Sequence, residues 1–179
     1  NSTNKTQTYD GSSWTEVNAL NTARFQGGGC GNQTAAVLAG GVYEASPDDY
    51  GGTEDYDGTS WTAGNDLSRG VNRGLAAAGI QTAAFIAGGQ PINALMETYD
   101  GTSWSEQNNL NTARAQNGEA GTTTAGLCFG GIGPGPSLTA GVDVTETWDG
   151  TSWSNSNDMN TNRREIGMSG TQTASLGFG

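Results

Sequence analysis

A six-residue motif that occurs four times constrains the fold of this chain more than any other feature. It consists of an aromatic residue, Asp-Gly, two hydroxyl residues and Trp, and its copies are residues 9–14, 56–61, 99–104 and 148–153. The four tryptophans are separated by 47, 43 and 49 residues. A period of this size is typical of repeat proteins, in which one supersecondary unit recurs along the chain.

Two further blocks recur with the same period. One is a short apolar run that ends in glycine, at residues 33–41, 81–89, 123–131 and 172–179. Such runs, bounded by turn residues, predict strands that are buried on both faces. The other block brings one arginine per repeat, followed by a Gly-rich segment; the arginines are Arg24, Arg73, Arg114 and Arg163. Small residues in a strand suit a place where backbones crowd together.

These landmarks predict four short strands in each unit. A Gly-rich strand follows the arginine, an apolar strand comes next, a third strand runs into Asp-Gly, and a fourth carries the tryptophan. Asp-Gly favours a tight hairpin because both residues tolerate the backbone dihedrals of turns. No stretch has helical periodicity with caps, and four-stranded units at this spacing are typical of a β-propeller. We therefore expect an all-β fold.

The order of the landmarks resembles the kelch repeat, in particular the variant kelch-like repeats of phage and environmental bacterial surface proteins. The resemblance implies a single β-propeller over residues 1–179. The phase of the repeat predicts four kelch-like, four-stranded blades, at 24–66, 73–108, 114–157, and 163–179 joined to 1–18. We expect the N-terminal strands to complete the C-terminal blade and close the ring. Two alternatives stay open: a neighbouring subunit supplies the missing half-blade, which gives a head-to-tail fibre, or the chain is part of a larger propeller.

Composition and charge exclude several classes of partner and chemistry. The chain has 18 acidic and 7 basic residues, a net charge of −11, and no histidine. Such a chain repels phosphate backbones, so we expect no nucleic-acid binding. No apolar run reaches the roughly 20 residues that span a bilayer, so we expect no membrane insertion. Histidine is the commonest general base and transition-metal ligand. We therefore predict no enzyme activity, catalytic residue, metal or cofactor.

Several repeated side chains have both a structural and a binding interpretation. The motif aspartates either accept backbone hydrogen bonds in turns or form a calcium or glycosidase site; they are Asp10, Asp57, Asp100 and Asp149. The arginines either pair with acidic or backbone groups where blades meet, or bind an acidic glycan as sialidase arginines do. The tryptophans either pack between adjacent blades or stack on sugars; they are Trp14, Trp61, Trp104 and Trp153. Cys30 and Cys128 are expected to be small buried hydrophobes.

Two insertions break the repeat and are the candidate binding loops. They cover residues 42–53 and 132–144. Loops that vary on a rigid scaffold often carry the binding function. An acidic loop that bears tyrosine suits a carbohydrate or a calcium-bridged ligand. The predicted ligand-binding residues are Tyr43, Asp48, Asp49 and Tyr50, together with the repeated Arg24, Arg73, Arg114 and Arg163.

These features predict a non-enzymatic module on an extracellular or virion surface. Its partner is expected to be a glycan or a surface receptor, and its role adhesion or recognition. One alternative is a structural protomer that self-associates head to tail through the split blade, as in a fibre. The other is a sialidase-like glycoside hydrolase built on the arginine face.

Overall fold

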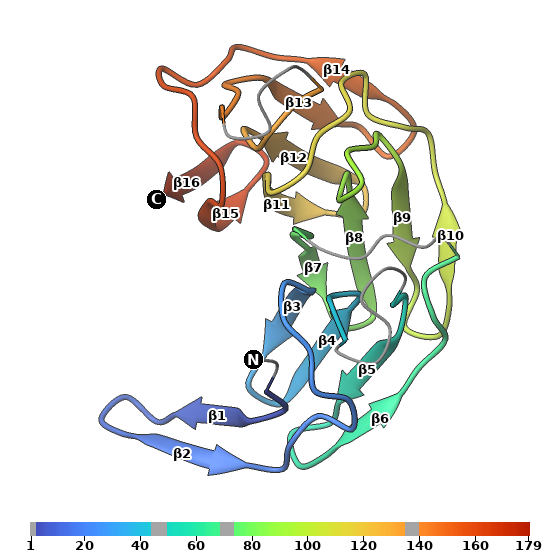
Figure 1. The fold of residues 1–179 in the computed structure, drawn as a ribbon, viewed down its shortest axis with the longest axis vertical. Coiled ribbons are helices and arrows are strands. Elements are labelled where there is room, and N and C mark those ends of the chain that lie inside the picture. The colour runs from blue at the N-terminus through green and yellow to red at the C-terminus, as the bar shows by residue number, and fades with distance from the viewer. Residues whose placement is uncertain (1–2, 44–49, 69–73, 135–139) are drawn as a thin grey trace.

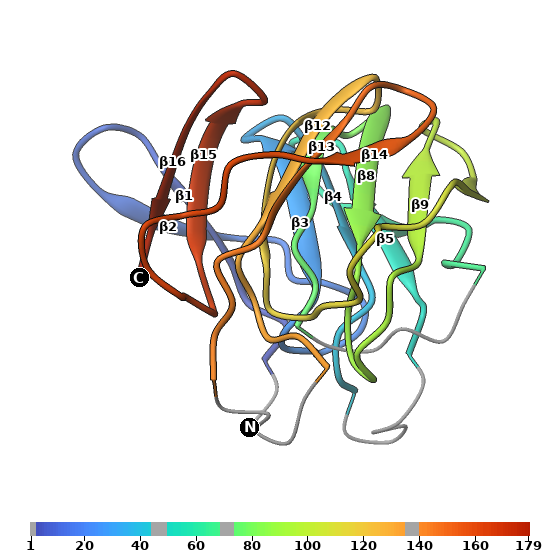
Figure 2. The same ribbon diagram turned by 90° about the horizontal axis from the view of Figure 1, so that it is seen from above.

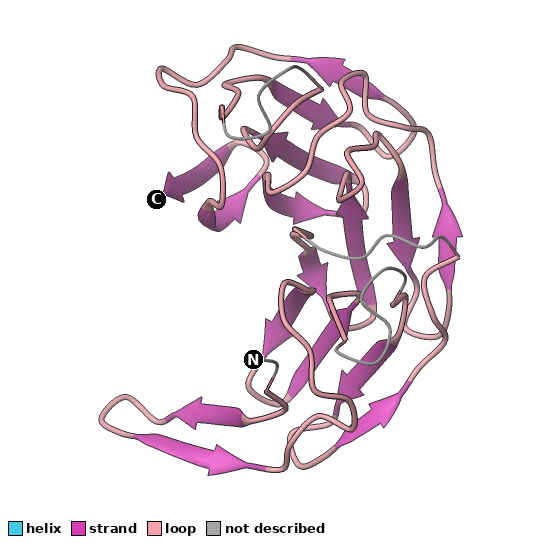
Figure 3. Ribbon diagram, in the orientation of Figure 1, coloured by secondary structure: helices cyan, strands magenta, loops and turns pink. Residues whose placement is uncertain are grey.

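The computed structural model describes residues 3–43, 50–68, 74–134 and 140–179. All regular secondary structure in these residues is β, as the sequence predicts, and none of them lies in a helix (Figure 3). Within these ranges there is accordingly no helix long and apolar enough to cross a membrane.

Twelve of the strands form three antiparallel sheets of four strands each. The first sheet contains β3 (Gly28–Asn32), β4 (Ala35–Ala39), β5 (Thr53–Tyr56) and β6 (Trp61–Ala63). The second contains β7 (Ala78–Ile80), β8 (Ala83–Ala87), β9 (Met96–Tyr99) and β10 (Trp104–Glu106). The third contains β11 (Gly118–Thr122), β12 (Ala125–Phe129), β13 (Thr145–Trp148) and β14 (Trp153–Asn155). In every sheet the strands pair in chain order.

Two hairpins remain at the ends of the described chain. The N-terminal hairpin consists of β1 (Thr6–Tyr9) and β2 (Trp14–Val17), and the C-terminal hairpin of β15 (Gly167–Thr171) and β16 (Ala174–Phe178). Figure 1 shows the sheets in an open arc, with β3, β7, β11 and β15 on its inner side and β6, β10 and β14 on its outer side. Figure 2 shows the strands running through the thickness of the arc.

The register repeats because the turn chemistry repeats. Each motif places its aromatic residue opposite its tryptophan, as in Tyr56 opposite Trp61 and Tyr99 opposite Trp104. The hairpin between the first two strands needs glycine at an equally fixed place. At Gly31, with φ of +117°, a Cβ would lie 2.3 Å from the Ala35 carbonyl oxygen. Backbone crowding between strands therefore explains the Gly-rich first strand.

The core lies between neighbouring sheets rather than in one centre. Val37 of β4, Ile86 of β8 and Trp104 of β10 pack in one cluster between the first and second sheets. A second cluster, with Phe85 and Trp153, lies between the second and third sheets. Each sheet can bury its apolar side chains only against a neighbour, so the end hairpins have one covered side each.

The predicted joining of the two ends is not present. The N-terminal and C-terminal hairpins form separate two-stranded sheets and lie at opposite ends of the arc (Figure 1). The N-terminal hairpin is attached to the first sheet, where Trp61 Nε1 donates to Thr6 Oγ1 at 2.9 Å. The C-terminal hairpin packs on the third sheet, where Ile166 joins the cluster of Phe129. Each hairpin therefore contacts the sheet next to it in sequence, and the arc stays open.

Candidate functional site

The repeated arginines are used by the fold wherever they are buried. Arg24 Nη2 forms an ion pair with Glu54 Oε1, and Arg114 Nη2 with Glu146 Oε1. Their side chains are at most 2% exposed. The other nitrogen, Nη1, donates to a backbone carbonyl ahead of the third strand, at 2.6 Å for Arg24 and 2.7 Å for Arg114. These two guanidinium groups match the structural interpretation and have no free face for an acidic glycan.

The glutamates that complete these pairs were not identified from the sequence. Glu54 and Glu146 occupy the second position of their third strands, and Glu97 stands at the same position of β9. Each carboxylate also binds the loop that leads to the arginine; Glu146 accepts from the backbone N–H groups of Asn111 and Thr112 at 2.7 and 3.1 Å. The recurrence of glutamate two residues before the motif aromatic is the signal that could have found them.

The other two arginines do not share this arrangement in the described structure. Arg73 lies outside the described residues. Arg163 is exposed, and its Nη1 donates to the Gly179 carbonyl at 2.8 Å. Among the described residues, therefore, Arg24, Arg114 and Arg163 each bind a different partner and do not share one acceptor.

The motif aspartates hold their own turns. Asp57 Oδ1 accepts from the backbone N–H groups of Thr59 and Ser60 at 2.8 and 2.7 Å, and the equivalent bonds recur at the other three copies. These backbone hydrogen bonds lower the pKa of every motif aspartate, because they stabilise the ionised carboxylate. The described residues contain no group of three or more Cys, Asp or Glu side chains placed to hold a metal ion.

The turn aspartates lead to a prediction about acid stability. Their pKa values are lower in the fold than in an unfolded chain. The stability that these carboxylates contribute is therefore present above about pH 4 and is lost as the pH falls through the folded pKa values. We expect the free energy of unfolding to fall between about pH 5 and pH 2. The double variant Asp57→Asn/Asp100→Asn should show a shallower fall, since an amide oxygen still accepts the turn bonds without titrating. Urea unfolding across this pH range tests it, and equal slopes would contradict it.

The insertion at residues 42–53 is only partly within the described structure. Asp48 and Asp49 lie outside the described residues, whereas Tyr43 and Tyr50 have ring centroids 5.6 Å apart. The Arg24 guanidinium lies over the Tyr50 ring, with Cζ 4.7 Å from its centroid. The structure thus brings together Tyr43, Tyr50 and Arg24, three of the predicted ligand-binding residues, although Arg24 is already held by Glu54.

Both cysteines lie where burial disfavours the thiolate form. Cys30 and Cys128 are both free thiols, and Cys128 is fully buried. Burial raises the pKa of the Cys30 thiol to about 12 and raises that of Cys128 further. Cys128 is thus a small buried residue, as the sequence predicts, whereas Cys30 is only half-buried.

A feature that the sequence did not predict lies on the inner side of the arc. A residue shortly after each repeated arginine has a left-handed backbone. Gln26, Gln116 and Glu165 are the second residue after theirs, with φ of 61°, 56° and 53°, and Gly74 directly follows Arg73, with φ of 64°. Gln116 N–H donates to the Gly74 carbonyl, and Glu165 N–H to the Gln116 carbonyl, both at 2.9 Å. These bonds link successive units. Only Gly74 adopts this conformation without a steric cost, since left-handed backbone costs other residues roughly 1–2 kcal/mol.

The side chains at these positions surround one cavity, which we call the inner cavity. It has a volume of about 330 Å³, and its lining includes Gln26, Leu75, Gln116, Glu165, Ile166 and Met168. Gln116 Oε1 and Asn117 Oδ1 are buried and have no hydrogen-bond partner among the described residues. The cavity therefore combines amide and carboxylate groups with apolar side chains. Such a lining can exchange hydrogen bonds with hydroxyl groups and pack against a carbon skeleton.

Comparisons with known protein families and with curated proteins find no match to this chain. The resemblance to kelch repeats therefore stays a prediction from the repeat itself.

Proposed function

We propose that this chain is a non-enzymatic recognition module of an extracellular or virion surface. Its scaffold is a kelch-like β-propeller, and its ligand is a neutral saccharide held at the inner cavity. The arrangement of the sheets supports this scaffold, because successive four-stranded sheets place their first strands side by side along the inner side of the arc (Figure 1). Propellers commonly present a binding surface where the inner strands of several blades meet.

One observation carries the proposal. Among the described residues, the three with a left-handed backbone that are not glycine all line the same cavity, and they are Gln26, Gln116 and Glu165. Glycine would suit that backbone better, as Gly74 does in the second unit. Backbone strain of this kind concentrates at functional sites, where the side chain serves a purpose that the scaffold does not need. A larger side chain at a costly position argues for ligand contact.

The chemistry of the lining selects the class of saccharide. Glu165 accepts hydrogen bonds from sugar hydroxyls, while the amides of Gln26 and Gln116 both donate and accept. Leu75 and Ile166 offer apolar surface to the face of a sugar ring. A carboxylate in the lining and the net charge of −11 disfavour an acidic sugar. A neutral saccharide therefore fits better than the sialic-acid-type ligand that the arginines suggested.

Glycine variants test the saccharide site without threatening the fold. Gln116→Gly and Glu165→Gly remove the side chains and suit the left-handed backbone, so we expect stability equal to or above that of the unsubstituted chain. Binding of neutral oligosaccharides, measured on a glycan array and by calorimetry, should weaken by roughly tenfold or more in each variant. Asn109→Gly, at an exposed loop position that does not line the inner cavity, is the control.

Two outcomes would contradict the proposal. Unchanged saccharide binding by the double variant would place the site elsewhere. Release of free sugar from a bound oligosaccharide would mean that the chain is a hydrolase.

A second candidate role, that of a structural protomer, is favoured by the exposed edges of the end hairpins.

A further inference from the structure

Neighbouring sheets are held together by two contacts that repeat along the arc. The first comes from the motif tryptophan, whose Nε1 donates to the first residue of the preceding sheet's third strand. Trp61 reaches Thr6 Oγ1 and Trp104 reaches Thr53 Oγ1, both at 2.9 Å. At the C-terminal end the equivalent acceptor would be Thr145, the first residue of β13, and the donor would be the motif tryptophan of a following sheet.

The second contact comes from an asparagine just after the fourth strand. Its side-chain Nδ2 donates to a carbonyl in the motif turn of the next sheet. The pairs are Asn18 to Thr59, Asn65 to Thr102 and Asn108 to Thr151, at 2.8–2.9 Å. The next asparagine in the series is Asn157, which is exposed and makes no such bond within the described residues.

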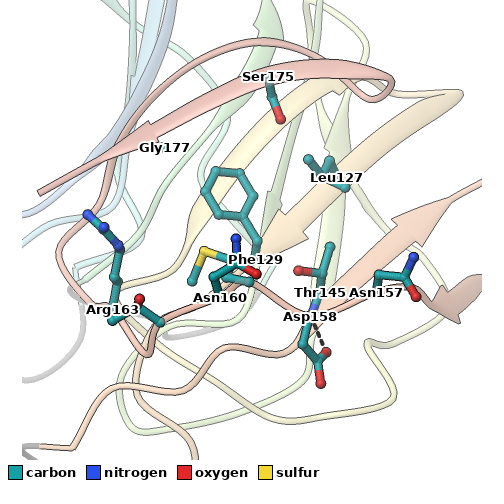
Figure 4. Close-up of a pocket in the computed structure, with 11 residues that line it drawn as sticks. Leu127, Phe129, Thr145, Asn157, Asp158, Asn160, Arg163, Ser175 and Gly177 are labelled. Atoms are coloured by element: carbon teal, nitrogen blue, oxygen red, sulfur yellow. Dashed lines mark hydrogen bonds between the residues drawn. The ribbon is translucent and has the colours of Figure 1, made fainter.

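Thr145 and Asn157 both line a cavity beside the C-terminal hairpin, which we call the junction cavity. It has a volume of about 410 Å³, and Thr145, Asn157, Arg163 and Ser175 are among its lining residues. Figure 4 shows these side chains around the hollow below β16. All five residues of β16 are exposed, and Leu176 and Phe178 are 70% and 57% exposed. The equivalent strand β8 is almost wholly buried. β16 is therefore a second strand that pairs with β15 on one edge only and carries exposed apolar side chains.

The N-terminal hairpin corresponds to the third and fourth strands of a unit, and in the described residues no further strand pairs with it. Tyr9 is opposite Trp14, as Tyr99 is opposite Trp104. Tyr9 and Trp14 are 47% and 66% exposed, whereas Tyr99 and Trp104 are 2% and 8% exposed. The two end hairpins thus carry complementary halves of one four-stranded sheet.

The hydrogen bonds of Gln33, beside the first sheet, indicate which strand should pair with β1 when they are compared with those of Gln81 in the next unit. Gln81 Nε2 donates to two carbonyls of the preceding sheet, Ala36 on the second strand and Tyr56 on the third, at 3.1 and 2.7 Å. Its counterpart Gln33 reaches only the third-strand carbonyl, that of Tyr9, at 3.1 Å. The missing acceptor corresponds in the repeat to Ser175 on β16.

We propose that β16 of one chain pairs with β1 of a second copy, and that the two hairpins complete a four-stranded sheet between the copies. By the register of the other sheets, Ser175 lies opposite the partner's Tyr9, as Ala84 lies opposite Tyr99. Trp14 of the second copy then donates to Thr145 Oγ1, Asn157 donates to the carbonyl of the partner's Ser12, and Gln33 of the second copy gains the Ser175 carbonyl.

A second copy fits this junction better than the chain's own N-terminal hairpin. Each hairpin is already attached to its neighbouring sheet, and the two are separate at opposite ends of the open arc (Figure 1). Pairing between copies satisfies all three contacts while both hairpins keep these attachments. Unpaired strand edges readily add a strand in this way, and a head-to-tail contact of two different surfaces continues from copy to copy.

One residue at the junction differs from the internal sheets. Arg24 and Arg114 pair with glutamate at the second position of the third strand, but β1 has Gln7 there. In the completed sheet Arg163 would face the neutral amide of the partner's Gln7. The junction should therefore be weaker than the contacts within the arc, and Gln7→Glu should strengthen it.

Mass measurement and directed cross-linking test the proposal. In a concentration series by analytical ultracentrifugation, the chain should exceed the mass of one copy. Trp14→Ala and Asn157→Ala, both at exposed positions, should raise the dissociation constant by roughly tenfold or more, while Ile80→Ala, an exposed apolar residue of β7, should not. Gln7→Glu should lower it by roughly tenfold, a gain that Arg163→Gln removes.

The double variant Thr8→Cys/Leu176→Cys, whose two positions face each other in this register, distinguishes the source of the hairpin. A disulfide between two copies on a non-reducing gel supports the proposal. A disulfide within one chain, or a single-copy mass at every concentration, would overturn it. The measurement is independent of saccharide binding, so either proposal can fail alone.

Discussion

Replacing Glu146 with alanine is expected to lower the free energy of unfolding by about 3–5 kcal/mol. The side chains of Glu146 and Arg114 are both 0% exposed, so the variant leaves a buried guanidinium without a counter-charge. It also removes the acceptor of two backbone N–H groups in the loop before Arg114. Urea denaturation at neutral pH measures the change.

The controls separate the buried charge from the loss of a side chain. Arg114→Met/Glu146→Leu should recover most of the loss, because two apolar groups of similar volume need no counter-charge. Glu16→Ala breaks the ion pair between Glu16 and Lys5, whose side chains are 54% and 64% exposed, respectively. It should lower the free energy of unfolding by less than about 1 kcal/mol. Equal effects of Glu146→Ala and Glu16→Ala would contradict this account of the arginines.

Truncating Trp104 to alanine is expected to cost about 3–5 kcal/mol. Trp104 is 8% exposed, stacks on Tyr99 with ring centroids 4.9 Å apart, and donates to Thr53 Oγ1. The variant leaves a cavity between the first and second sheets and removes a hydrogen bond that joins them. Thermal and urea unfolding of the dilute protein measure the loss.

Trp14→Ala is the matched control, since Trp14 has the same place in the motif. It is 66% exposed, so the variant should change the stability of a single copy by less than about 1 kcal/mol. A loss as large as that of Trp104→Ala, at a concentration where the chain is a single copy, would mean that Trp14 is covered within its own chain. The N-terminal hairpin would then complete the C-terminal one in the same molecule.

Much of the local structure could be predicted from the repeats. The apolar runs became β4, β8, β12 and β16, and every motif became a hairpin with its aspartate in the turn. These features depend on residues within a few positions of one another, so one copy of the unit contains the necessary information. The sequence also offered a structural interpretation of Arg24 and Arg114. It did not identify their partners, because Glu54 and Glu146 lie about 30 residues further along the chain.

The inner cavity could not be predicted from the sequence, for a different reason. Gln26, Gln116 and Glu165 belong to three units, and nothing in their types indicates a left-handed backbone. Gln116 and Glu165 each donate a backbone N–H to the preceding unit, and side chains from all three units line one cavity. Both are properties of several units together.

By itself the sequence determined the all-β repeat, the order of strands in each unit and the chemistry of the turns. Only the tertiary structure decided which copies of a motif are covered. Trp14 and Trp104 occupy the same position of the motif, yet one is largely exposed and the other buried. The physical reason is that each sheet buries its aromatic side chains against the preceding sheet, and within the described residues no sheet covers that side of the N-terminal hairpin.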